Sequence, residues 1–73
     1  MYSITLQLAD HVKQYSIHPR PSEGWIVSLE EDRRLVRQIC YRDWHRVERA
    51  ALKFRREVED HMARGWELRR ATP

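Results

Sequence analysis

The sequence predicts an α+β domain in which a four-stranded antiparallel meander is followed by one long C-terminal helix packed on a face of the sheet (ββββα). Two observations predict it. Apolar and polar residues alternate through much of the first half of the chain, which is the two-residue period of half-buried strands. Further on, the apolar residues recur every three or four positions, which is the period of an amphipathic helix.

The first two strands are predicted to form a hairpin. In the first strand, polar residues separate four apolar residues: Tyr2, Ile4, Leu6 and Leu8. Residues 9–11 resemble a tight turn, and residues 12–18 again alternate, so they are predicted to be the second strand. Pro19 and Pro21 are expected to end this strand, because proline has no N–H to donate to a sheet.

A third strand is predicted over residues 25–29, ended by the acidic residues 30–32. Residues 33–42 allow two interpretations. As a strand they place Leu35, Ile39 and Tyr41 on one face, with Arg37 intruding there. As a helix they cluster four residues on one side, Leu35, Val36, Ile39 and Cys40. We favour the strand, because two apolar runs around an acidic turn make a natural meander; three strands and two helices remain the alternative.

The long helix is the clearest element of the sequence. Six apolar residues define its buried face: Trp44, Val47, Ala51, Phe54, Val58 and Met62. Asp43 is a suitable N-cap, Gly65 suits the left-handed position after a helix, and Trp66 is expected to fold back on the last turn. The helix is therefore predicted over residues 44–64. The domain is predicted to span residues 1–68, followed by a frayed polar tail, 69–73.

Composition limits the classes of protein that this chain can represent. Seventy-three residues form one domain at most, and the net charge of +3 is mild. The lone Cys40 allows no intramolecular disulfide, which is typical of a reducing compartment. The N-terminus lacks the basic segment of a signal peptide, and no apolar run reaches the roughly 20 residues of a membrane span. We expect a cytoplasmic protein that does not enter a membrane.

A row of basic residues is the most suggestive functional feature. Its members step by four and three along the predicted helix, so they share one face, expected roughly opposite the apolar stripe: Arg42, Arg46, Arg49, Lys53 and Arg56. Such a row can track phosphates of a nucleic acid. The same residues suit an ordinary solvated face, since Lys53–Glu57 and Arg56–Asp60 are spaced for intrahelical ion pairs. The solvated face is the simpler interpretation.

Residues that carry catalysis or bind metals show no recognisable pattern. The four histidines and Cys40 form no C-x-x-C or H-x-x-x-H pair, so no metal site is predicted. Cys40 fits a small, partly buried thiol, and the acidic residues 30–32 fit a solvated turn. With no paired acid, base or nucleophile, we predict neither an enzyme nor a cofactor.

Three tryptophans are expected to serve the core: Trp25 in a strand, Trp44 at the helix start and Trp66 at its end. The stretch 25–66 also resembles the WGR domain, a sheet-plus-helix module that binds DNA in some poly(ADP-ribose) polymerases. The similarity lies in a tryptophan-bearing strand and in Ala50, Phe54 and Gly65-Trp66 along and after a helix. The Trp-Gly-Arg signature itself is absent, so no binding residue is carried over.

From the sequence we therefore expect a small non-enzymatic binding or accessory module of unidentified target. Its partner would be another protein or a second copy of the chain, because a sheet covered on one face leaves a face and an edge open. The alternative is a weak, sequence-tolerant nucleic-acid-binding domain that uses the arginine-rich helix face.

Overall fold

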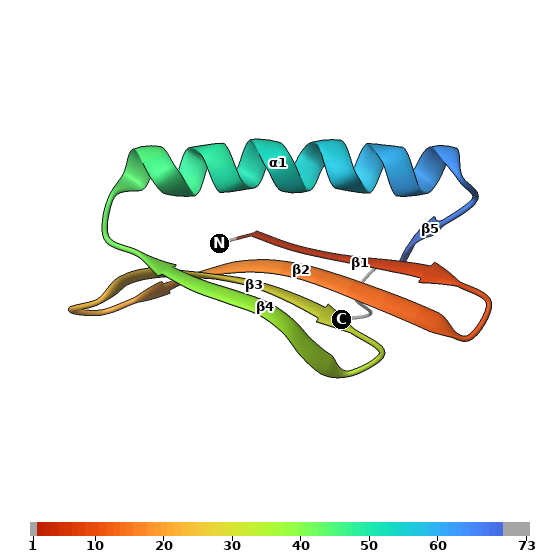
Figure 1. The fold of residues 1–73 in the computed structure, drawn as a ribbon, viewed down its shortest axis with the longest axis horizontal. Coiled ribbons are helices and arrows are strands. Elements are labelled where there is room, and N and C mark those ends of the chain that lie inside the picture. The colour runs from red at the N-terminus through yellow and green to blue at the C-terminus, as the bar shows by residue number, and fades with distance from the viewer. Residues whose placement is uncertain (1, 70–73) are drawn as a thin grey trace.

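The computed structural model, which describes residues 2–69, confirms an α+β fold with one helix over an antiparallel sheet (Figure 1). Each element has the order and character that its periodicity predicts, and one short strand is added at the C-terminal side. The elements are β1 (Tyr2–Leu8), β2 (His11–Arg20), β3 (Gly24–Glu31), β4 (Arg34–Tyr41), α1 (Trp44–Ala63) and β5 (Glu67–Arg69).

The sheet has the order β4-β3-β2-β1-β5, and every neighbouring pair is antiparallel. The predicted meander forms the first four of these strands. After the helix the chain returns to the sheet, where β5 pairs with residues Thr5–Gln7 of β1. The prediction of a frayed tail is therefore wrong for Arg69, which pairs with Thr5; residues 70–73 lie outside the described residues.

Helix α1 lies across one face of the sheet (Figure 1), and a hydrophobic core fills the space between them. The helix contributes Val47, Phe54 and Val58, which its three-to-four-residue period places on one side. The sheet contributes five buried residues from its first three strands, Leu6, Tyr15, Ile17, Val27 and Leu29. The rings of Tyr15 and Phe54 meet edge to face at 4.8 Å between centroids, a favourable aromatic geometry.

The opposite face of the sheet has no helix over it in the described part of the chain (Figure 1). The strand register places a row of neutral polar side chains there, one from each of four neighbouring strands: Ser3, Ser16, Ser28 and Gln38. Polar side chains therefore line the middle of this face, where Ser28 is buried among its neighbours, while α1 covers the apolar face.

Strand β2 is longer than predicted and contains Pro19, which pairs with Trp25. The expectation that Pro19 ends the strand is wrong, because β2 has only one neighbour at this point. The described pairing of β1 with β2 stops at Tyr2–Ile17. Pro19 therefore lies where β2 pairs with β3 alone, and a residue without an N–H is tolerated there.

Residues 33–42 adopt the predicted strand rather than the helix, but one predicted orientation is wrong. Leu29 pairs with Arg37 whereas Glu30 pairs with Leu35, so Val36 is an extra residue that forms a β-bulge. Arg37, Ile39 and Tyr41 keep the phase of Leu29 and face the helix. Leu35 pairs with Glu30 and therefore faces the uncovered side, where it is exposed.

The bulge arises from the turn that joins β3 to β4. Asp32 and Arg33 both have positive φ, at 50° and 68°, as a two-residue type I′ hairpin turn requires. The Asp32 carboxylate accepts a hydrogen bond from the Val12 N–H at 2.9 Å. This bond and a second one to His11 lower the pKa of Asp32. The turn thus fixes the pairing of Glu31 with Arg34. The extra residue, Val36, then brings Arg37 opposite Leu29, so that both side chains point to the helix side of the sheet.

Both ends of α1 are capped as predicted. The Asp43 carboxylate accepts a hydrogen bond from the His45 N–H, and Gly65 takes φ +106° after the last turn. Trp66 folds back so that its N–H donates to the His61 carbonyl. Trp44 departs from its predicted core role: it packs on Trp25 at 5.1 Å but remains 52% exposed.

Replacing Phe54 by alanine should lower the free energy of unfolding by about 3–5 kcal/mol, because its side chain is 3% exposed at the centre of the core. Chemical denaturation of the variant measures this loss. The control is Leu52→Ala, whose side chain on the same helix is 56% exposed and should change stability by less than about 0.5 kcal/mol. Equal losses in the two variants would contradict the described packing of α1.

Candidate functional site

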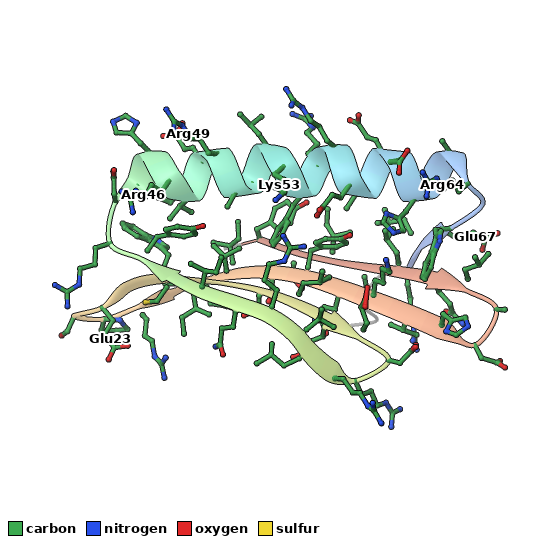
Figure 2. The ribbon with its side chains drawn as sticks, viewed as in Figure 1. Glu23, Arg46, Arg49, Lys53, Arg64 and Glu67 are labelled. Atoms are coloured by element: carbon green, nitrogen blue, oxygen red, sulfur yellow. The ribbon has the colours of Figure 1, made fainter. Side chains whose placement is uncertain are left out.

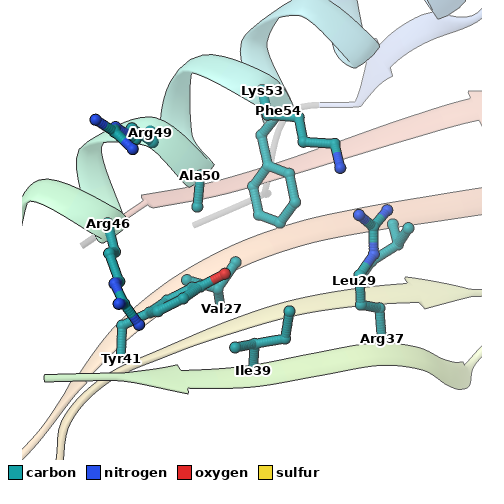
Figure 3. Close-up of a pocket in the computed structure, with 10 residues that line it drawn as sticks. All are labelled: Val27, Leu29, Arg37, Ile39, Tyr41, Arg46, Arg49, Ala50, Lys53 and Phe54. Carbon is teal, nitrogen blue, oxygen red and sulfur yellow. The ribbon is translucent and has the colours of Figure 1, made fainter. Parts of the chain in front are cut away.

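A groove of about 420 Å³ runs between α1 and the edge strand β4 (Figure 3). Its lining has two parts. The floor and lower walls are apolar and aromatic, formed by Val27, Leu29, Ile39, Tyr41, Ala50 and Phe54. The remaining lining residues are all cations: Arg37, Arg46, Arg49 and Lys53.

The helix positions three of these cations because Arg46, Arg49 and Lys53 follow one another by three and four residues. The core-facing residues of α1 lie roughly 100° to 160° around the helix from these cations, and Arg46 and Lys53, the nearer two, lie on the flank that looks toward β4. Ala50 lies between Arg46 and Phe54 on the same flank. Its short side chain leaves open the space that a larger residue would fill.

The side chains approach the groove from both walls (Figure 3). Arg46 extends from the first turns of α1 toward β4, and Arg37 rises from β4 toward the helix. Arg49 points outward from the helix, away from the groove floor (Figure 2). A ligand in the groove would therefore meet cations from the helix and from the strand.

One carboxylate adjoins these cations. A Glu57 Oε1 atom lies 3.6 Å from Nη2 of Arg37, and Oε2 of Glu57 is buried without a hydrogen-bond partner. In residues 2–69, no ion pair is formed by the other three cations of the groove. Arg46, Arg49 and Lys53 therefore present positive charges that have no ion-pair partner in the described chain.

The intrahelical ion pairs expected from the spacing are not the ones that form. Glu57 pairs across to Arg37 instead of with Lys53. Asp60 pairs with Arg64 at 3.3 Å rather than with Arg56. The positive charges of Lys53 and Arg56 on this helix face therefore lack the acidic partners that the sequence spacing suggests.

The predicted basic row is divided by the structure. Arg46, Arg49 and Lys53 line the groove, whereas Arg42 and Arg56 do not. Arg46 and Lys53 lie on the flank of α1 beside β4, whereas Arg49 points away from the groove floor (Figure 3). Arg37 is the functional candidate that sequence reasoning missed. Its signal was present, since it is a charged residue in phase with the apolar face of its strand.

A second polar cluster surrounds Lys13 at the other end of the sheet. The Nζ atom of Lys13 lies 2.7 Å from Nε2 of His61, 3.2 Å from Glu31 and over the Trp66 ring. Nδ1 of His61 lies 2.6 Å from the Glu57 carbonyl, so Nδ1 donates and Nε2 accepts from Lys13. These mutual contacts secure the C-terminal turn of α1 to β2.

Side chains that bind metals form no assembled site in residues 2–69. No group of three or more histidine, cysteine, aspartate or glutamate side chains in that range is placed to hold a metal ion. Cys40 is exposed, and its thiol donates to the Glu23 carbonyl at 3.4 Å. The helix found in that range lacks the apolar length needed to cross a membrane.

Comparison with family models, with curated proteins and with solved structures gave no match for this chain. The resemblance to the WGR domain stays a prediction.

Below the groove, the hydroxyl of Tyr15 has its pKa raised to about 12, chiefly by burial and secondly by the charge of Glu57. A pKa raised by folding means that the folded state holds this proton more tightly than the unfolded state. The free energy of unfolding should therefore fall as the pH rises from 10 to about 12. Denaturation measured across this pH range should show that the free energy of unfolding falls less steeply in Tyr15→Phe than in the unchanged protein. An equally steep fall in the variant would mean that Tyr15 is not the group responsible.

Proposed function

We propose that this chain is a non-enzymatic binding module that holds an anionic group of its partner in the groove between α1 and β4. One observation carries the proposal: Arg37, Arg46 and Lys53, which come from two elements, line one apolar-floored groove, and Arg46 and Lys53 have no ion-pair partner in residues 2–69. The lining otherwise consists of aliphatic and aromatic side chains, a set suited to binding.

The groove suits a carboxylate or a phosphate. A guanidinium offers a planar fork of donors that matches either group, and the apolar floor lowers the effective dielectric below that of water, which strengthens charge–charge attraction. Arg37 can keep its contact with Glu57 at one side while its remaining N–H donors serve a ligand. Lys53 adds a charge without a fixed geometry.

A second candidate function is nucleic-acid binding along the helix, and it is supported by the same absence of ion pairs at the basic residues. No ion pair in the described range involves any member of the predicted row, Arg42, Arg46, Arg49, Lys53 and Arg56. Basic side chains without ion-pair partners are the electrostatic footprint expected of a surface that follows phosphates.

Reversing one charge in the groove tests the first candidate. Arg46→Glu should weaken binding of poly-glutamate about tenfold or more, because a charge-assisted contact is lost and a repulsion is added. Fluorescence anisotropy at low salt measures the affinity. The matched control is Arg55→Glu, which makes the same change on another face of α1, where Arg55 lies 3.9 Å from Glu59. Equal losses in both variants would mean that binding follows net charge alone, and the groove would be rejected.

A salt titration tests the second candidate. If the row engages about four phosphates of a duplex, the plot of log affinity against log salt should have a slope near −3.6. Replacing Arg49 by alanine should make the slope about one unit shallower. Arg20→Ala is the control, since Arg20 lies at the end of β2 and pairs with Glu23. If Arg49→Ala leaves the slope of log affinity against log salt unchanged, the helix row is not the binding surface.

A further inference from the structure

The edge strand β4 leaves one side of its backbone open to a partner. It is the terminal strand of the sheet order, with β3 on one side and no described strand on the other. Its edge also carries exposed apolar side chains from Leu35, Val36 and Ile39. An edge of this kind can pair with an added strand, because alternate N–H and C=O groups point outward.

The open edge and the basic groove share residues. Arg37, Ile39 and Tyr41 belong to β4, and all three line the groove. A strand added beside β4 would direct every second side chain to the helix side of the sheet. Those side chains would enter the groove, beneath Arg46 and Lys53 of α1 (Figure 3).

We propose that the partner of this module is a short extended acidic peptide, which adds to β4 as a further strand and directs its carboxylates into the groove. This inference rests on the proposed function and names the class of ligand. Carboxylates at alternate positions lie roughly 7 Å apart along a strand. They can therefore meet Arg37, Arg46 and Lys53 while the intervening side chains face the uncovered side of the sheet.

The backbone of β4 favours a peptide over a nucleic acid. An edge strand presents carbonyl oxygens as well as N–H groups, and these oxygens repel phosphates but accept bonds from peptide amides. The apolar Leu35 lies on the uncovered side at this edge and is exposed. An alternating peptide can cover this side chain with an apolar residue while its acidic residues meet the cations.

The charge of β4 argues against a second copy of the chain at this edge. The strand carries Arg34 and Arg37 and no acid, and Arg42 follows it. Pairing two copies of β4 would bring these like charges together, which destabilises cross-strand pairs. Charge complementarity therefore selects an acidic strand.

The test uses the whole chain and two capped seven-residue peptides of identical composition. In one, glutamate alternates with valine; in the other, the glutamates form one block. Calorimetry at low salt should show the alternating peptide binding about tenfold or more tightly. Two N-methylated forms of that peptide, each blocked at one of the two alternate sets of amides, provide the decisive comparison. Methylation of the amides that face β4 should abolish binding. Methylation of the other set should change the affinity less than about twofold, because those amides point away from β4.

Hydrogen exchange on the complex locates the added strand. Backbone amides of β4 should gain protection, and those of β5 at the opposite edge should not. If both methylated forms and the block peptide bind alike and Arg46→Glu still weakens them, the strand proposal fails while the groove survives. If these peptides and poly-glutamate do not bind, both proposals fail. Tighter binding of a twelve-nucleotide single strand, or a peptide-free dimer in sedimentation, would also overturn the acidic-peptide assignment.

Discussion

The architecture depends on one helix covering one face of a wider sheet. Phe54, packed edge to face on Tyr15, anchors α1 over the centre of the sheet, where β2 and β3 supply Tyr15, Ile17, Val27 and Leu29. A helix is about 10 Å wide, whereas five strands spaced about 4.8 Å apart extend nearly 20 Å between the outer strands. The flanks of the sheet therefore remain uncovered, and the groove beside β4 results from this mismatch in width.

The same mismatch explains why the groove combines an apolar floor with a basic rim. The residues beneath the helix must be apolar to form the core, and Ile39 and Tyr41 continue that surface outward along β4. Residues on the flank of α1 border both the core and water. Long cationic side chains suit this position, since their methylene stems cover apolar surface while their charged ends stay solvated. Arg46 and Lys53 occupy it.

Sequence periodicity predicted most of the fold because local patterns encode it. Alternation located the first three strands, and the acidic turn favoured a strand over a helix for residues 33–42. Asp43 and Gly65 located the ends of α1, because both caps are made by neighbours in sequence. Strand β5 escaped prediction because three residues are too few to show a period. Its place beside Thr5–Gln7 depends on where the long helix delivers the chain.

The candidate site was predicted only in part, because it depends on contacts between distant residues. Arg46, Arg49 and Lys53 were found from helical spacing alone. Arg37 joins them only when β4 folds beneath the helix, and its pairing with Glu57 could not be deduced from local sequence. The orientation of Leu35 was missed for a similar reason, since the positive φ angles of Asp32 and Arg33 set the strand register.

The bulge at Val36 also bears on how this protein avoids uncontrolled assembly. A bulge locally breaks the hydrogen-bonding pattern of an edge and increases its twist. The pairing of β4 with β3 is therefore continuous only from Arg37 to Tyr41, and the register is shifted by one residue at Leu35 and Arg34. Such an edge accommodates a short strand but cannot template the long, flat pairing on which fibrils grow. The extra residue thus protects an exposed apolar edge against sheet-to-sheet aggregation.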